Sequence, residues 1–232
     1  MSQPIRHLTD NPDVHFGPDA LDLYPELARN VARIVATWSL VENNISLAFI
    51  MLVGSDSETS ISMYKALTVT ATKDVTMKAV AQDKLQPQDF LLYQATRNIL
   101  KRTARQRNNV VHGLIGHCEQ IKDALVIIHQ DVLFDQMNDH LRKKHLLPDK
   151  EAVLRAAEER FASKACVYKD GDFKKVIERL NWAVSVSNDL AIICAEVHRE
   201  HSRARSRLSS EPLIRKELTR LSQGQKTSQG EL

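Results

Sequence analysis

Apolar residues recur at alternating spacings of four and three between Pro25 and Gly54. Such spacing places a single apolar stripe along one face of a helix and is typical of a long helix packed in a bundle. Proline suits the first helical position, and glycine is a natural C-terminal cap. The pattern therefore predicts a helix over residues 25–53 with these inward residues: Leu27, Val31, Ile34, Trp38, Val41, Ile45, Ala48 and Leu52.

Similar patterns predict that most of the remaining chain is helical. The spacing Ser55-x-x-Glu58 fits a capping box for a second helix that ends near Val69. Further helices are expected from Thr72 to about Leu85, from Pro87 to His112, from Pro148 to about Lys164 and from Asp170 to about Val197. Gly113 is expected to end the helix that begins at Pro87, because glycine often follows the last helical residue.

The segment after Gly113 has a different character. Two β-type runs, Ile115–Ile121 and Ala124–Gln130, flank a short turn at Lys122–Asp123 and predict a β-hairpin. Glycine and proline are scarce, at 7 each, and only 5% of the residues are aromatic, which favours helices over a β-sandwich or barrel. We therefore expect an all-α fold, an up-and-down helical bundle with a small β-hairpin insertion after the helix over residues 87–112.

Three segments differ in composition. Residues 1–24 lack periodicity and contain three of the seven prolines, so we expect an N-terminal arm. Residues 25–202 form the helical domain. Residues 203–232 are basic and poor in apolar residues, and we expect a disordered tail.

The charge distribution argues for a local rather than a global binding surface. Residues 203–232 hold seven basic and three acidic residues, a net charge of +4, whereas the whole chain carries +3. The remaining body is therefore near −1, and any affinity for nucleic acid has to come from a local patch.

Other features of the composition bear on the cellular compartment and on metal or cofactor binding. Three cysteines lie far apart without a Cys-x-x-Cys pair, and the histidines show no metal-ligand spacing, so we expect a cytoplasmic protein without metal or cofactor. No signal peptide or membrane span is expected.

The helix over residues 87–112 loses its apolar stripe for two turns. Among residues 101–109 only Ala104 is plainly apolar. Between Arg97 and Arg107 there is no acid, and five cations occur: Arg97, Lys101, Arg102, Arg105 and Arg107. This run predicts a surface for an anionic ligand such as RNA, with Arg97, Lys101, Arg102 and Arg105 as the binding residues.

Arg107 and His112 follow that run at the predicted end of the helix. Arginine is a fixed cation that can fork around phosphate, and histidine exchanges protons near neutral pH. At about 100° per residue, Asn108 lies about 40° from His112, whereas Arg107 lies about 140° away. Either the long arginine wraps part of that angle, or Arg107 reaches the histidine of a second copy across a twofold axis.

The sequence Arg107-Asn108-x-x-x-His112 resembles the Arg-x4–6-His signature of HEPN domains, including the polar residue after the arginine. Trp38-Ser-Leu-Val-Glu42 is also similar to the first helix of many such domains, in which an acidic residue often faces the motif. The similarity in architecture spans roughly residues 25–200, and its specific part is about six residues.

The resemblance implies a homodimer whose two motifs line a shared cleft. Many members are metal-independent RNases that act as toxins or in phage defence. Arg107 would then stabilise the phosphoryl oxygens, His112 would move a proton, Asn108 would position the phosphate or His112, and Glu42 would orient Arg107 or His112. An antitoxin or other regulatory protein is a further possible partner.

One position departs from the family pattern. Where the subgroup neutralised by nucleotidyltransferase antitoxins has a tyrosine, this chain has Leu114, which argues against that mode of neutralisation. Two alternatives stay open, a non-catalytic RNA- or protein-binding module of the same fold and a purely structural helical dimer.

Overall fold

The computed structural model describes residues 2–10, 12–54, 57–132, 134, 150–196 and 203–229. The chain divides into two compact units. The first, here called the sheet unit, comprises Met1–Ala36 and Arg105–Arg179, and the second, the helical unit, comprises Thr37–Ala104 and Leu180–Leu232. The boundary between the two units falls within three long helices.

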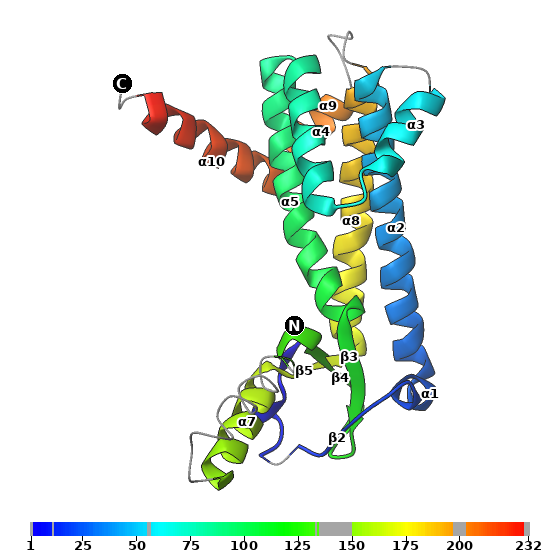
Figure 1. Ribbon diagram of the computed structural model, residues 1–232, viewed down its shortest axis with the longest axis vertical. Helices are drawn as coiled ribbons and strands as arrows, with labels where there is room; N and C mark the ends of the chain where they lie inside the picture. The colour runs from blue at the N-terminus through cyan, green and yellow to red at the C-terminus, as the bar shows by residue number, and fades with distance from the viewer. Residues whose placement is uncertain are drawn as a thin grey trace. The chain divides into compact units, whose positions relative to one another are not determined.

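The described chain is mostly helical, which confirms the expected fold class at that level. The helices are η1 (Ile5–His7), α1 (Asp19–Leu23), α2 (Pro25–Val53), α3 (Ser57–Ala66), α4 (Thr70–Lys84), α5 (Pro87–Val111), α7 (Lys150–Lys164), α8 (Asp170–Ala195), α9 (Arg203–Ser210) and α10 (Pro212–Gln229) (Figure 1). The strands are β1 (Gln3–Pro4), β2 (Val14–Phe16), β3 (Gly113–Cys118), β4 (Ile121–His129) and β5 (Cys166–Lys169).

The predicted starts of α2, α5 and α8 and the predicted end of α2 are confirmed. Helix α3 ends at Ala66, before the expected Val69, and the expected end of the last helix near Val197 lies outside the described residues. Helix α2 begins at Pro25 and ends before Gly54, whose φ of 65° is the left-handed conformation expected of a glycine cap. Helix α5 begins at Pro87. The predicted stripe of α2 is buried except at Val31, which is half-buried. The expected start of a helix at Pro148 lies outside the described residues, and α7 is described from Lys150.

Helix α2 is also the one described helix long and apolar enough to cross a membrane by length and composition. This differs from the sequence expectation, although a core helix passes the same test. Its outward side chains include the exposed apolar residues Leu40, Leu47 and Met51.

The sheet unit contains an antiparallel five-stranded sheet in the order β1-β5-β4-β3-β2. The predicted hairpin is confirmed as β3 and β4, but its predicted turn is wrong. Cys118 pairs with Ile121, so the turn lies at Glu119–Gln120. Asp123 instead has a φ of 54° within β4, where the register shifts. Aspartate tolerates this left-handed conformation, which is why the same residue suggested a turn.

The other strands come from short segments that the sequence pattern did not reveal. Strand β1 pairs with β5, and β2 pairs with β3, so the predicted N-terminal arm contributes both edge strands of the sheet. Strands of two to four residues are too short to show alternation. The core on this sheet consists of Ile5, Cys118, Ile121, Ala124, Val126, Ile128, Ala165 and Val167, with Phe161 and Ala162 of α7 packed against it.

The junction between α5 and β3 is packed closely at Gly113. A Cβ atom there would lie 2.3 Å from Cγ2 of Ile127 and 2.9 Å from the carbonyl oxygen of Asn109. The φ of Gly113 is not positive, so the requirement for glycine is one of space and not of backbone conformation. Gly113 therefore lets the end of α5 continue directly into a strand paired with β4.

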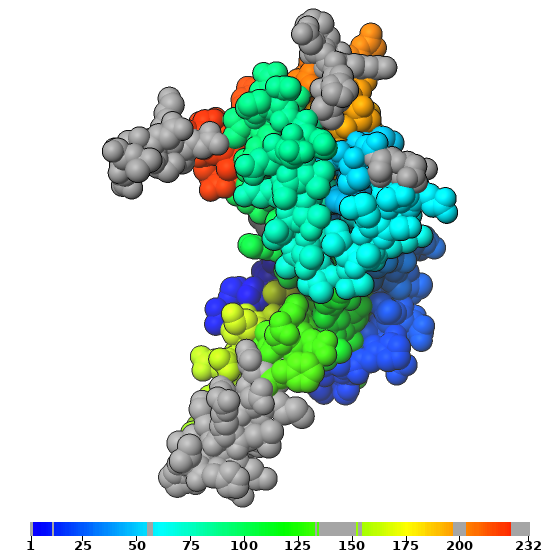
Figure 2. Space-filling view, turned by 45° about the horizontal axis from the view of Figure 1, so that its top comes forward, coloured from blue at the N-terminus to red at the C-terminus, as the bar shows by residue number. Residues whose placement is uncertain are grey.

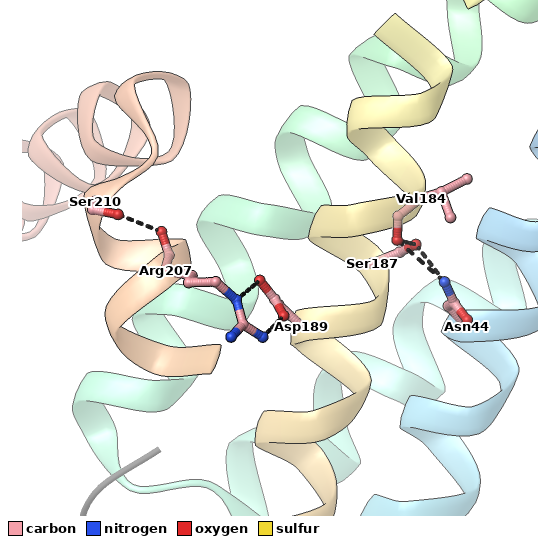
Figure 3. A network of polar contacts seen from close by, with 6 residues as sticks. All are labelled: Asn44, Val184, Ser187, Asp189, Arg207 and Ser210. Atoms are coloured by element: carbon pink, nitrogen blue, oxygen red, sulfur yellow. Dashed lines mark hydrogen bonds and ion pairs between the residues drawn. The ribbon is translucent and has the colours of Figure 1, made fainter. Parts of the chain in front are cut away.

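The helical unit holds α9 and α10, which differ from the expectation of a disordered tail. Arg205 binds both carboxylate oxygens of Asp89 on α5, at 2.6 and 2.7 Å. Arg207 forms the same kind of bidentate ion pair with Asp189 on α8 (Figure 3). Composition alone missed these helices because their few apolar residues, such as Leu208, are fully buried and their arginines meet buried acids.

Glu217 of α10 forms a third link. Only 2% of this residue is exposed, and its carboxylate accepts hydrogen bonds from Asn98 at 3.0 Å and from Arg220 at 2.6 Å. Arg102 of α5 pairs with its second oxygen at 2.9 Å. These donors, with Arg220 first, lower the pKa of Glu217 to about 2 although burial opposes the shift.

Polar contacts also join the other helices of this unit. Asn44 of α2 donates to the carbonyl of Val184 and to the hydroxyl of Ser187 on α8, at 3.2 and 3.1 Å (Figure 3). Helices α3 and α4 cover one face of the unit (Figure 2). Arg97 of α5 binds Asp74 of α4.

We expect Gly113→Ala to destabilise the protein. The added methyl group overpacks the junction, at a cost of about 1–3 kcal/mol, which corresponds to roughly 2–4 °C per kcal/mol in the thermal midpoint of a chain of this size. Circular dichroism during heating measures the shift. Gly171→Ala is the matched control, because a Cβ atom there meets nothing within 4 Å. Equal midpoints for the two variants would contradict this account of Gly113.

We expect Glu217→Gln to lower the free energy of unfolding by about 1–3 kcal/mol at pH 7, because the charged acceptor is lost. The pKa of Glu217 is lowered in the folded state, so its stabilisation is complete above the ordinary value of 4.5 and is lost as the pH falls towards 2. The deficit of the variant should therefore shrink between about pH 4.5 and pH 3. Urea denaturation of wild type and variant at each pH measures it.

Glu58→Gln, at an exposed position of α3, is the control for Glu217→Gln. A deficit for Glu217→Gln that stays constant from pH 7 to pH 3 would show that the carboxylate charge is not its source.

Candidate active site

The residues predicted from the sequence fall into two groups. Arg105, Arg107, Asn108 and His112 lie in the sheet unit, and Glu42, Arg97, Lys101 and Arg102 lie in the helical unit. Each group has its own contacts and is described separately.

Arg107 and His112 meet within one chain. Nη1 of Arg107 lies 3.1 Å from Nε2 of His112 and donates to Oδ1 of Asn108 at 3.0 Å. The angle of about 140° between the two residues on the helix is thus bridged by the length of the arginine side chain. Of the two arrangements open from the sequence, the structure shows the one in which the arginine wraps around its own helix.

This contact assigns the protons of His112. A guanidinium group only donates, so Nε2 of His112 accepts and the neutral ring carries its proton on Nδ1. The backbone NH of His112 donates to the carbonyl of Asn108 at 2.9 Å, which continues the helical hydrogen-bond pattern by one residue. His112 is exposed, while Arg107 and Asn108 are half-buried.

Arg107 keeps unused hydrogen-bonding capacity. Its Nε atom is buried and has no partner among the described residues. A buried donor without a partner is costly, and an oxyanion that reached the guanidinium edge would remove that cost. The pair therefore offers a cation for a phosphoryl oxygen beside an unprotonated imidazole nitrogen.

The strand pairing brings a second histidine to this region. His129 is the cross-strand partner of Gly113, the residue after His112. Its Nδ1 atom lies 3.2 Å from a carboxylate oxygen of Asp131. No sequence motif includes His129, and the β3–β4 register is the observation that places it near the motif.

The basic run upstream of the motif is largely neutralised in the helical unit. Asp74 binds both Arg97 and Lys101, the latter at 2.9 Å. Glu217 pairs with Arg102. Neither acid is close to the run in the sequence, which is why counting charges along α5 missed them. Arg105, in the sheet unit, is exposed.

Glu42 has a local partner. It accepts a hydrogen bond from Nε1 of Trp38 at 2.9 Å, one turn earlier on α2. Both residues line a pocket of about 400 Å³ in the helical unit, together with Arg97, Lys101 and Asp74. The structure thus groups the Trp38–Glu42 pair with the basic run.

No group of three or more potential metal ligands occurs among the described residues. Comparison of the chain with protein-family models, with curated proteins and with solved structures found no match.

We expect Arg107→Ala to change the tautomer of His112. The wild-type contact holds the proton on Nδ1, whereas a solvated neutral imidazole has no such constraint. Long-range ¹H–¹⁵N spectra distinguish the two tautomers. Asn109→Ala, on the same turn, is the control. An unchanged His112 signal in Arg107→Ala would show that the two side chains do not interact in solution.

Proposed function

We propose that the protein is a metal-independent endoribonuclease of the HEPN type, with the helices arranged as an up-and-down bundle. The observation that carries the proposal is the approach of Nη1 of Arg107 to Nε2 of His112 at an exposed helix end. This contact supports the proposal because a guanidinium and an imidazole 3.1 Å apart can both reach one phosphodiester.

The proposed reaction uses the ribose itself as nucleophile. Nε2 of His112 accepts the proton of the 2′-OH once Arg107 turns onto the phosphate. The 2′-oxygen–phosphorus bond forms and the bond from phosphorus to the 5′-oxygen breaks. The leaving 5′-oxygen takes a proton from water, and His112 then returns its proton to the solvent. The products are a 2′,3′-cyclic phosphate and a 5′-hydroxyl. General acid–base catalysis of this kind contributes about 10²–10⁴ in rate.

The other residues have supporting roles in this proposal. The amide oxygen of Asn108 accepts from Arg107 and holds the guanidinium beside His112. Arginine then stabilises the charge that develops on the phosphoryl oxygens. The role of Glu42 in orienting the motif rests on the resemblance alone, because its hydrogen bond goes to Trp38.

We further propose a cytoplasmic homodimer that acts as a toxin or in phage defence, with RNA as substrate and an antitoxin as a possible partner. An exposed apolar stripe on α2 supports the proposal of a dimer, because a second copy could cover it. The stripe consists of residues spaced by seven and four: Leu40, Leu47 and Met51. Each chain already holds its own Arg107–His112 pair.

Two observations favour a second candidate function. Arg107 is in hydrogen-bond contact with Nε2 of His112, the nitrogen that would accept the proton. In addition, three cations of the basic run are paired with acids: Arg97, Lys101 and Arg102. Both features suit a non-catalytic module that binds RNA or protein. Binding without cleavage, unchanged by loss of His112, would identify it.

We expect His112→Ala to reduce cleavage of single-stranded RNA by at least about 10²-fold, because the proton-transfer group is removed. A fluorescence-quenched RNA in the presence of EDTA reports the rate, and mass spectrometry identifies the cyclic phosphate. His7→Ala, at an exposed histidine of the same unit, is the control. Undiminished cleavage by purified His112→Ala would refute the proposed mechanism.

The same variants test how the site is assembled. If each chain provides both residues, a mixture of Arg107→Ala and His112→Ala chains stays inactive. Recovery of activity on mixing would show instead that the arginine of one copy serves the histidine of the other.

A further inference from the structure

A pocket of about 450 Å³ lies in the sheet unit, the unit that contains the motif. Its volume falls within the range of about 300–1,000 Å³ that is typical of small-ligand sites. The residues that line it come from α5, α8, β5 and the N-terminal segment: Gln106, Asn109, Asp172, Lys175, Val176, Arg179, Tyr168 and Ser2.

The α5 wall of this pocket adjoins the motif. Asn109 and His112 are three residues apart, which places them about 60° from each other around the helix axis. Residues at this spacing are neighbours, with Cβ atoms about 5–6 Å apart. The hydrogen bond from the His112 NH to Asn108 keeps His112 in this helical geometry. A ligand in the pocket therefore lies within one helical turn of the proposed proton-transfer group.

The α8 wall is cationic. Lys175 is exposed and Arg179 is half-buried, and their spacing of four residues puts both on one face of α8. Burial lowers the pKa of Arg179, and a cation that is partly withdrawn from water attracts an anion more strongly. Among the described residues that line the pocket, the one acid is Asp172, whose carboxylate accepts a hydrogen bond from the backbone NH of Lys169 at 3.2 Å. Two cations against one acid leave a net positive lining.

The α5 wall offers hydrogen bonds without charge. The side-chain amides of Gln106 and Asn109 make no hydrogen bond within the described part of the chain. An amide both donates and accepts, which matches the edge of a nucleobase and a ribose hydroxyl. Tyr168 closes the pocket on the β5 side, where burial raises the pKa of its phenol and keeps it protonated.

We propose that this pocket binds one nucleotide of single-stranded RNA next to the phosphodiester held by the motif. Lys175 and Arg179 bind its phosphate, and Gln106 and Asn109 contact its base or ribose. The inference rests on the proposed function for the adjacent cut, but binding can be measured without cleavage. The volume accommodates one nucleotide and not a duplex, so the substrate class is single-stranded.

The test uses the full chain with His112→Ala, which prevents cleavage, and a fluorescein-labelled single-stranded RNA of twelve nucleotides. We expect Lys175→Ala to raise the Kd about 3–10-fold and to reduce the slope of log Kd against log salt by about 0.7, the value for one phosphate contact on a single strand. Lys175→Arg should restore most of the affinity, because it restores the charge.

Lys174→Ala is the matched control. Lys174 is the preceding residue on α8, is exposed, and pairs with Asp170 at 2.6 Å outside the pocket. The Lys174→Ala substitution removes one positive charge from α8, as Lys175→Ala does. We expect the Kd of the Lys174→Ala variant for RNA to change less than about twofold. Asn109→Ala, compared on oligo-U, oligo-A and oligo-C, is expected to change the order of affinities and not only their magnitude.

The outcomes separate this inference from the proposed function. Equal RNA affinity for Lys174→Ala and Lys175→Ala, or no measurable binding by the parent chain, overturns the inference even if the wild type cleaves RNA. Binding that depends on Lys175 in a protein that does not cleave RNA supports the pocket and refutes the nuclease. Cleavage with a raised KM and an unchanged kcat in Lys175→Ala, in the presence of His112, supports both.

Discussion

The candidate site depends on the close approach of the backbone at Gly113. Because no Cβ atom stands between this residue, Ile127 and the carbonyl of Asn109, α5 can end and β3 can begin without an intervening loop. His112 is the single residue between the two elements. Its backbone is held on one side by the helix and on the other by the β3–β4 ladder. The exposed side chain of His112 is thereby attached to a backbone that is held on both sides.

The helical unit depends on a different interaction, the ion pairing of buried carboxylates with arginines. Asp89, Asp189 and Glu217 are almost completely buried, and each is compensated by arginine. Burying a carboxylate without such partners is costly, so α9 and α10 stay attached where their arginines meet these acids. In the same way, part of the basic run on α5 forms ion pairs with acids of the helical unit, so these cations contribute to structure.

Several features were encoded locally and could be predicted. Proline and glycine mark the ends of α2 because their backbone preferences act within one turn, and apolar spacing marks the buried face of the same helix. The β3–β4 hairpin was recognisable from its two apolar runs, whereas its turn was misplaced because Asp123 adopts a turn-like φ inside a bulge. The motif itself, from Arg107 to His112, was visible because its residues are contiguous.

Local sequence patterns thus predict the helical class, the ends of α2 and the presence of an arginine, an amide and a histidine at one helix end. The partners of these residues depend on folding. The contact of Arg107 with His112 depends on side-chain reach, the pairing of Arg102 with Glu217 joins residues more than a hundred positions apart, and Lys175 comes beside Asn109 only through folding. Backbone preference is a local property that a sequence displays directly. Charge compensation and pocket lining depend on segments that meet only when the chain is folded.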